Sequence, residues 1–193
     1  MMVEMGKQDI PEKWEKEIEE SLCKMLPQVC EANERIKKEL RMAIWLGGPG
    51  KKDKMRYIRD RIRKILENEN FEVIFSEDYS GFADIVSKEK QEIDTLQLAM
   101  IMAMSAGSSA EAIEFANDED LRSKVIVFIP KEYRNGYVYR SLSERHHLIA
   151  EPTCFSLKKL KKQDTSDIAV KMLHCAIHHR LDLFRKNRTK EFA

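Results

Sequence analysis

The spacing of apolar residues changes near residue 42, and this change divides the chain into two parts. Before it, apolar side chains recur at three- and four-residue intervals in two stripes: Trp14, Ile18, Leu22, Met25 and then Val29, Ala32, Ile36, Leu40. This period is typical of amphipathic helices. Pro27 separates the two stripes, because proline cannot continue a helix. The pattern therefore predicts an N-terminal helical arm over residues 1–41.

From residue 42 onward, short apolar runs alternate with helical periods. The runs that predict strands are 43–46, 71–75, 96–104 and 124–129, with a short last strand around Phe155. Helices are predicted from the N-cap Asp53 to about Asn68, over 83–93, from Gly107-Ser108-Ser109 to about Asn117, and from Asp164 or Thr165 into the C-terminal region. Strands that alternate with helices indicate a parallel sheet. We expect residues 42–193 to form an α/β domain with a flavodoxin- or Rossmann-like short parallel sheet flanked by helices.

The run 96–104 fits either a helix or a strand by its composition. Its Ala, Leu and Met residues favour a helix, and Ile101 is its one β-branched residue. Its position favours a strand, because a helical stretch precedes it and a Gly-Ser turn follows. That context is expected of a central strand buried on both faces.

Composition and charge argue against several classes of protein. The 193 residues carry a formal net charge of +1, so no global charge attracts nucleic acid or an anionic membrane. The basic segment 51–64 lacks the interleaved aromatic residues of a base-stacking surface and is more typical of a solvated helix face. The chain has no apolar run of about eighteen residues and no N-terminal signal segment. We expect a cytoplasmic protein with no membrane partner and no direct nucleic-acid binding.

The histidine and cysteine residues do not complete a metal site. His174 and His178 have the i, i+4 spacing of a helical metal-binding pair, but no carboxylate or thiol is spaced to complete the ligand set. The cysteines form no CxxC pair, and we expect free thiols that pack as small hydrophobic residues: Cys23, Cys30, Cys154 and Cys175. We therefore expect no metal and no other cofactor.

A glycine-rich turn, Gly47-Gly48-Pro49-Gly50-Lys51, follows the first predicted strand. It is not a Walker A loop, because Lys52 stands where Ser or Thr is needed, and it is not GxGxxG, because Asp53 takes the place of the last glycine. One interpretation is an ordinary strand-to-helix turn. The other is a backbone that approaches a phosphate or sugar, with charge from Lys51 and Lys52. The turn by itself favours the first interpretation.

The segment from Ser105 to Glu111 links the third predicted strand to the next helix. Its small residues and helix N-terminus would face the crevice at the carboxyl edge of the sheet, where open α/β sheets bind ligands. A helix N-terminus favours an anion there. Glu111 is expected in the first helical turn, where it either faces that crevice or serves as the capping-box partner of Ser108. The segment alone does not decide between these two roles.

Three segments, taken in order, resemble the nucleoside 2-deoxyribosyltransferase family. Residues 43–49 (AIWLGGP) resemble its opening strand and turn, I-Y-L-A-G-P, and residues 71–78 resemble its second strand with a P-E-D-like end. Residues 107–116, with the strand 124–129, are similar to its G-T-x-x-E-x-G-x-A motif and the strand that follows. Trp45, Ser108 and Ile113 replace the tyrosine, threonine and glycine of that pattern, and Gln97 stands where the family has an acidic residue. The resemblance covers residues 42–130.

A second resemblance is to bacterial defence effectors that are related to this family in pattern. They carry P-G-x-x-x-K-D and S-P-G-S-x-A-E signatures, which Gly50, Lys52-Asp53 and the segment from Ser105 to Glu111 resemble. The two resemblances together imply a flavodoxin-like fold and cleavage or transfer at an N-glycosidic bond, with Glu111 as the nucleophile. The implied substrate is a nucleoside, a nucleotide or an NAD-like dinucleotide.

The functional hypotheses are an enzyme and two alternatives that need no catalysis. In the enzyme, the candidate substrate contacts are Gly47, Gly48, Lys51, Lys52, Ser105, Gly107, Ser108 and Ser109. The alternatives are a nucleotide-sensing module or a protein-interaction module of the same fold, within bacterial defence. We also expect a homo-oligomer formed through the arm, because two helices of this length cannot bury both stripes by themselves. Docking of the arm on its own domain is the competing explanation.

Overall fold

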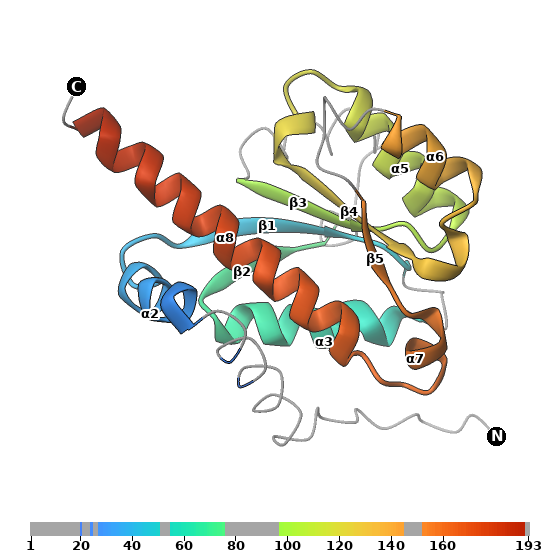
Figure 1. The fold of residues 1–193 in the computed structure, drawn as a ribbon, viewed down its shortest axis with the longest axis horizontal. Helices are drawn as coiled ribbons and strands as arrows, with labels where there is room; N and C mark the ends of the chain where they lie inside the picture. Colours follow the sequence, from blue (N-terminus) through green and yellow to red (C-terminus); the bar gives the residue numbers. More distant parts are fainter. Residues whose placement is uncertain are drawn as a thin grey trace.

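The computed structural model describes residues 20, 24, 27–50, 55–75, 97–144 and 152–191. Its centre is a sheet of five parallel strands in the order β2-β1-β3-β4-β5 (Figure 1). The strands are β1 (Met42–Gly47), β2 (Phe71–Ile74), β3 (Leu98–Met102), β4 (Val125–Pro130) and β5 (Thr153–Phe155). This order is that of flavodoxin-like folds, in which the strand sequence reverses between β1 and β3. The predicted α/β class is confirmed, and so is the strand predicted within 96–104.

Alternate side chains of the strands enter two separate apolar cores. In β1, Ile44 and Leu46 pack on the side of α3 (Arg56–Asn68) and α8 (Ser166–Glu191), whereas Trp45 packs on the side of α5 (Ala106–Asn117) and α6 (Tyr137–Ser143). Figure 1 shows α5 and α6 apart from α3 and α8, with the sheet between them. Every residue of β3 is buried, as expected for a central strand covered on both faces.

Several helix boundaries differ from the sequence-based prediction. Helix α3 begins at Arg56 with Met55 as its N-cap, and the expected cap Asp53 lies outside the described residues. Helix α5 begins at Ala106, one to three residues before the predicted cap. The turn at Asn135-Gly136 leads directly into α6, and α7 (Leu157–Lys161) follows β5; neither short helix was predicted. Helices of one or two turns carry too few apolar repeats for a periodic pattern to show. The helix predicted over 83–93 lies outside the described residues.

The described part of the arm is largely α2 (Pro27–Ile36), which packs against α8 (Figure 1). Ile36 is buried in the core, and Ala32 and Leu40 are partly buried against it. The apolar stripe of this second arm helix is therefore used within the chain itself, as the docking explanation expected. Residues 1–19 lie outside the described residues, so self-association through the arm stays a prediction.

A buried polar cluster holds α2 against the domain. Arg180 of α8 is fully buried, and its guanidinium donates to Asn33 Oδ1 at 3.1 Å and to the Glu69 carbonyl oxygen at 2.7 Å. Asn33 in turn donates to Glu69 Oε2 at 3.1 Å. Burial lowers the pKa of the Arg180 guanidinium to about 10, and the carboxylates of Glu69 and Glu34 oppose that shift. The cluster joins α2, α8 and the C-cap residue of α3 at the amino edge of the sheet.

Within the described ranges, no helix has both the length and the apolar character needed to cross a membrane.

Candidate functional site

The carboxyl ends of β1 and β3 meet at the point where the strand order reverses. The register pairs Gly47 at the end of β1 with Ile101 near the end of β3, so the chain leaves both strands at the same edge of the sheet. The segments that leave there are the turn after Gly47 and the start of α5 at Ala106. In open α/β folds this is the crevice that takes ligands. The candidate residues predicted from the sequence fall in or beside these two segments, and the fold brings the end of β1 and the start of α5 together.

Glu111 contacts the end of β1 through Trp45. The fully buried indole of Trp45 donates from Nε1 to Glu111 Oε1 at 2.9 Å, and the glutamate itself is partly buried. The sequence pattern predicted Glu111 in the first helical turn. Because α5 begins at Ala106, Glu111 lies in the second turn. The indole can only donate, so it bonds the carboxylate without neutralising its charge.

The capping-box role for Glu111 is wrong. Ser105 is the N-cap of α5, and its Oγ accepts from the backbone N–H of Ser108 at 3.2 Å. Ser108 Oγ returns the bond by accepting from the Ser105 N–H at 3.0 Å. The helix starts earlier than the pattern suggested, so the third helical position is taken by Ser108. Glu111 is therefore not used in capping, and its carboxylate faces β1.

Gly47 is adjacent to that carboxylate. A Cβ on Gly47 would lie 2.9 Å from Glu111 Oε1 and 3.2 Å from its Cδ, so a side chain there would displace the carboxylate. Gly48 has a φ of +148°, a conformation that favours glycine, and its Cβ would meet Met102 Cε at 2.9 Å. Gly47 therefore leaves room for the Glu111 carboxylate in its present position, and Gly48 is favoured by its backbone conformation.

Arg59 of α3 is a residue of this edge that sequence analysis missed. It is 1% exposed, and its guanidinium donates to the carbonyl oxygens of Leu46 at 2.8 Å and Pro49 at 3.1 Å. The signal available in the sequence was its place between Ile58 and Ile62 on the apolar side of a helix. It had been counted with the solvated basic face of residues 51–64.

The remaining candidates have different surroundings. Ser108 is buried, and its hydroxyl accepts from the Met104 N–H at 3.1 Å as well as from Ser105, so it is engaged in the helix cap. Gly107 is exposed, and a Cβ on it would meet nothing within 4 Å. Ser109 is partly buried in the same turn. Lys51 and Lys52 lie outside the described residues, and substrate contacts for all of these residues stay predictions.

Gln97, the counterpart of an acidic residue in the resembling family, lies at the other edge of the sheet. It precedes β3, and its Oε1 accepts from the backbone N–H of Ala43 at 2.8 Å. Its carbonyl oxygen is 2.7 Å from His179 Nε2. Gln97 therefore helps to join β1, β3 and α8 at the amino edge, away from Glu111.

The histidines of α8 form a ring pair. His174 and His178 lie edge to face with ring centroids 4.4 Å apart. Burial lowers the pKa of His174, and the neighbouring His178 lowers it further. Burial also lowers the pKa of His179. In the part of the chain that the structure describes, no three His, Cys, Asp or Glu side chains are grouped to hold a metal ion, and Cys154 and Cys175 are free thiols.

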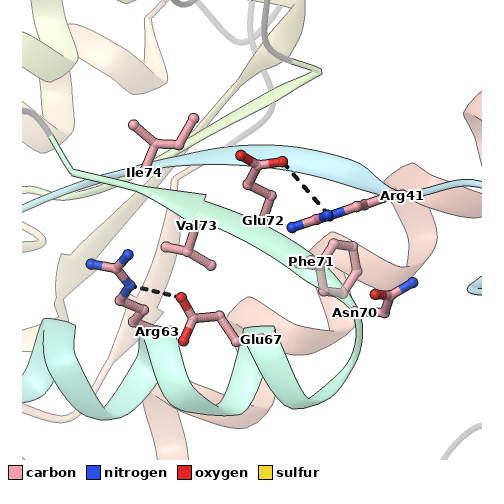
Figure 2. Close-up of a pocket in the computed structure, with 8 residues that line it drawn as sticks. All are labelled: Arg41, Arg63, Glu67, Asn70, Phe71, Glu72, Val73 and Ile74. Carbon is pink, nitrogen blue, oxygen red and sulfur yellow. Dashed lines mark hydrogen bonds and ion pairs between the residues drawn. The ribbon is translucent and has the colours of Figure 1, made fainter. Parts of the chain in front are cut away.

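A hollow of about 550 Å³ lies along the outer side of the edge strand β2 (Figure 2). Its rim carries two ion pairs, Arg41 with Glu72 at 3.6 Å and Arg63 with Glu67 at 2.8 Å. None of the candidate residues lines it. Its carboxylates are paired with arginines at the surface, and such pairs are common on solvated faces. We therefore place the candidate site at the carboxyl edge between β1 and β3 and not in this hollow.

The fold and the site together define a flavodoxin-like α/β protein with a hydrogen-bonded glutamate at the switch point of its sheet. A family model for the STM3845 retron effector protein matches residues 55–187, more than half of the chain. The chain therefore belongs to this family of retron effectors, which are bacterial defence effectors. The matched region contains α3, the sheet from β2 to β5 and Glu111. No curated protein matches the chain.

Proposed function

We propose that this retron effector cleaves or transfers at the N-glycosidic bond of a nucleoside, a nucleotide or an NAD-like dinucleotide, with Glu111 as the nucleophile. The observation that carries the proposal is the hydrogen bond of 2.9 Å from Trp45 Nε1 to Glu111 Oε1, beside Gly47 at the switch point. The resemblance to nucleoside 2-deoxyribosyltransferases assigns the same glutamate to the same task. Family membership supports a role in defence but leaves the chemistry open.

The chemistry that a glutamate can perform there is a double displacement. Its carboxylate attacks the anomeric carbon, the C–N bond breaks, and the base leaves with the bonding electron pair and takes up a proton. A water molecule or an acceptor base then attacks the same carbon and releases the carboxylate. The transition states resemble an oxocarbenium ion, which a nearby negative charge stabilises.

The helix N-terminus beside Glu111 suits a phosphorylated sugar. The amides of Ala106 and Gly107 belong to the first turn of α5, where backbone N–H groups lack intrahelical acceptors. Such groups bind phosphate or sugar oxygens. In this proposal Lys51 and Lys52 add positive charge, which would favour a nucleotide or a dinucleotide over a plain nucleoside.

A base-release assay with Glu111→Gln tests the proposal. The protein is incubated with nucleosides, deoxynucleotides and NAD, and free base is measured by chromatography. Glutamine keeps the shape and the acceptor for Trp45 but cannot attack, so turnover should fall at least about a hundredfold with the melting temperature retained. Glu114→Gln, in the next turn of α5, is the matched control and should keep full turnover.

Two outcomes would contradict the proposal. Turnover retained in Glu111→Gln would remove this residue from the mechanism. Ligands that raise the melting temperature of the wild-type protein without any base release would instead favour the nucleotide-sensing module.

A further inference from the structure

Arg59 and Glu111 contact the same turn from opposite faces of the sheet. Arg59 belongs to α3, which packs on one face, and Glu111 belongs to α5, which packs on the other. Between them lies the turn that leaves β1. Arg59 donates to its two carbonyl oxygens at Leu46 and Pro49, and the carboxylate of Glu111 lies against Gly47.

The geometry of the guanidinium suits this task. The two accepting carbonyls bracket Gly47 and Gly48, and a planar guanidinium can donate to both at once from Nη1 and Nη2. A lysine ammonium has no such fixed pair of donors. The aliphatic part of Arg59 also leaves little room at the turn, since an added Cβ on Gly48 would lie 3.3 Å from Arg59 Cδ.

The guanidinium is itself held in place. Its central carbon lies 4.3 Å from the centroid of the buried Phe75 ring, within the range of a cation–π contact. With the side chain 1% exposed and two charge-assisted bonds to backbone oxygens, its position is restricted. A restricted donor restricts its acceptors, so the turn is restrained as well.

We propose that Arg59 is a positioning residue, which holds the Gly47-Gly48 turn as a rigid wall against the carboxylate of Glu111. Without the two hydrogen bonds from the guanidinium, the turn is no longer held in place. The carboxylate of Glu111 then loses its fixed orientation toward Trp45 and toward the sugar. As a role in turnover, this inference rests on the proposed function. As a statement about geometry, it can be tested without any substrate.

The substrate-free test follows the indole N–H resonance of Trp45 by NMR. The chain has two tryptophans, and a Trp14→Phe variant assigns the signals. Arg59→Met and Arg59→Lys should displace or split the Trp45 resonance, because both remove the paired guanidinium bonds to Leu46 and Pro49. Arg63→Met is the matched control: Arg63 lies on the same helix, 4.8 Å from the same Phe75 centroid, but its bond of 2.8 Å goes to Glu67 at the surface. It should leave the Trp45 resonance unchanged.

The kinetic arm measures base release by the same variants. Arg59→Lys should lower kcat about ten- to a hundredfold and leave KM within about twofold, since the loss is one of alignment. Should Arg59→Met fail to fold, Arg59→Lys decides by the same two readouts. An Arg59 variant with wild-type melting and a wild-type Trp45 resonance would overturn the inference, as would an equal displacement in Arg63→Met. If neither the wild-type protein nor any variant releases base, the proposed function is wrong. The Trp45 resonance then still tests whether Arg59 positions the turn.

Discussion

Two phenylalanines, Phe71 at the start of β2 and Phe75 directly after its end, each have a buried arginine stacked on the ring, and the two arginines have different tasks. At the amino edge, Arg180 lies 3.5 Å from the Phe71 centroid and bonds Asn33 and the carbonyl of Glu69. At the carboxyl edge, Arg59 lies 4.3 Å from the Phe75 centroid and bonds the turn after β1.

The two arginines differ in what their hydrogen-bond acceptors contact. The partners of Arg180 are the arm helix α2 and the end of α3, so this cluster joins elements of the fold at the amino edge of the sheet. The acceptors of Arg59 are carbonyl oxygens of the turn that lies against Glu111 at the carboxyl edge of the sheet. The same residue type therefore bonds elements of the fold at one edge and the turn beside Glu111 at the other. Burial alone does not distinguish the two arginines; the contacts of their acceptors do.

The largest expected effect is on stability, from Arg180→Ala. The change leaves Asn33 and the Glu69 carbonyl without their buried donor, and breaking such a cluster costs about 3–5 kcal/mol. For a domain of this size the melting temperature should fall by roughly 10 °C, measured by calorimetry. Arg185→Ala on the exposed part of the same helix is the control and should change the melting temperature little, because surface ion pairs contribute about 0–1 kcal/mol. Wild-type melting of Arg180→Ala would remove the contrast between the two edges.

The next effect is on chemistry, from Trp45→Phe. Phenylalanine keeps an aromatic ring in the core but removes the donor to Glu111. A hydrogen bond to a charged group contributes about 1.5–3 kcal/mol, so kcat/KM for base release should fall about ten- to a hundredfold. Trp45→Tyr places a hydroxyl where the resembling family carries tyrosine and should recover part of the loss. Unchanged kcat/KM in Trp45→Phe would show that the indole bond does not contribute to turnover.

The smallest effect is expected from Gly107→Ala, and its two readouts should move in opposite directions. The added Cβ meets no protein atom, and alanine is favoured over glycine in a helix by about 0.5–1 kcal/mol. The melting temperature should therefore rise slightly, as read by differential scanning fluorimetry. Base release should fall if the sugar approaches this exposed backbone. Higher stability with unchanged turnover would place the substrate away from Gly107.

The periodic pattern of apolar residues predicted most of the fold because the longer helices and strands can each be identified from their own segment of sequence. The run Lys124 to Ile129 and the helical period around Ile58 and Ile62 each carry enough apolar repeats to identify their element. The buried strand within 96–104 could be assigned only from its neighbours, since a strand covered on both faces does not alternate. The short helices α6 and α7 were missed because one or two turns leave no readable period.

The sequence by itself determined the α/β class, and it predicted the carboxyl edge as the place of the site and Glu111 as its candidate nucleophile. Each of these follows from patterns within one segment, or from segments that resemble a known motif in order. Only the tertiary structure decided that Ser105 caps α5, that Trp45 bonds Glu111, and that Arg59 is buried against the turn after β1 and does not lie on a solvated face. These relations join residues far apart in the chain, Trp45 and Glu111 being 66 positions apart. When two helices pack on opposite faces of a sheet, side chains from both can meet at one turn. A local sequence pattern does not show which side chains these are.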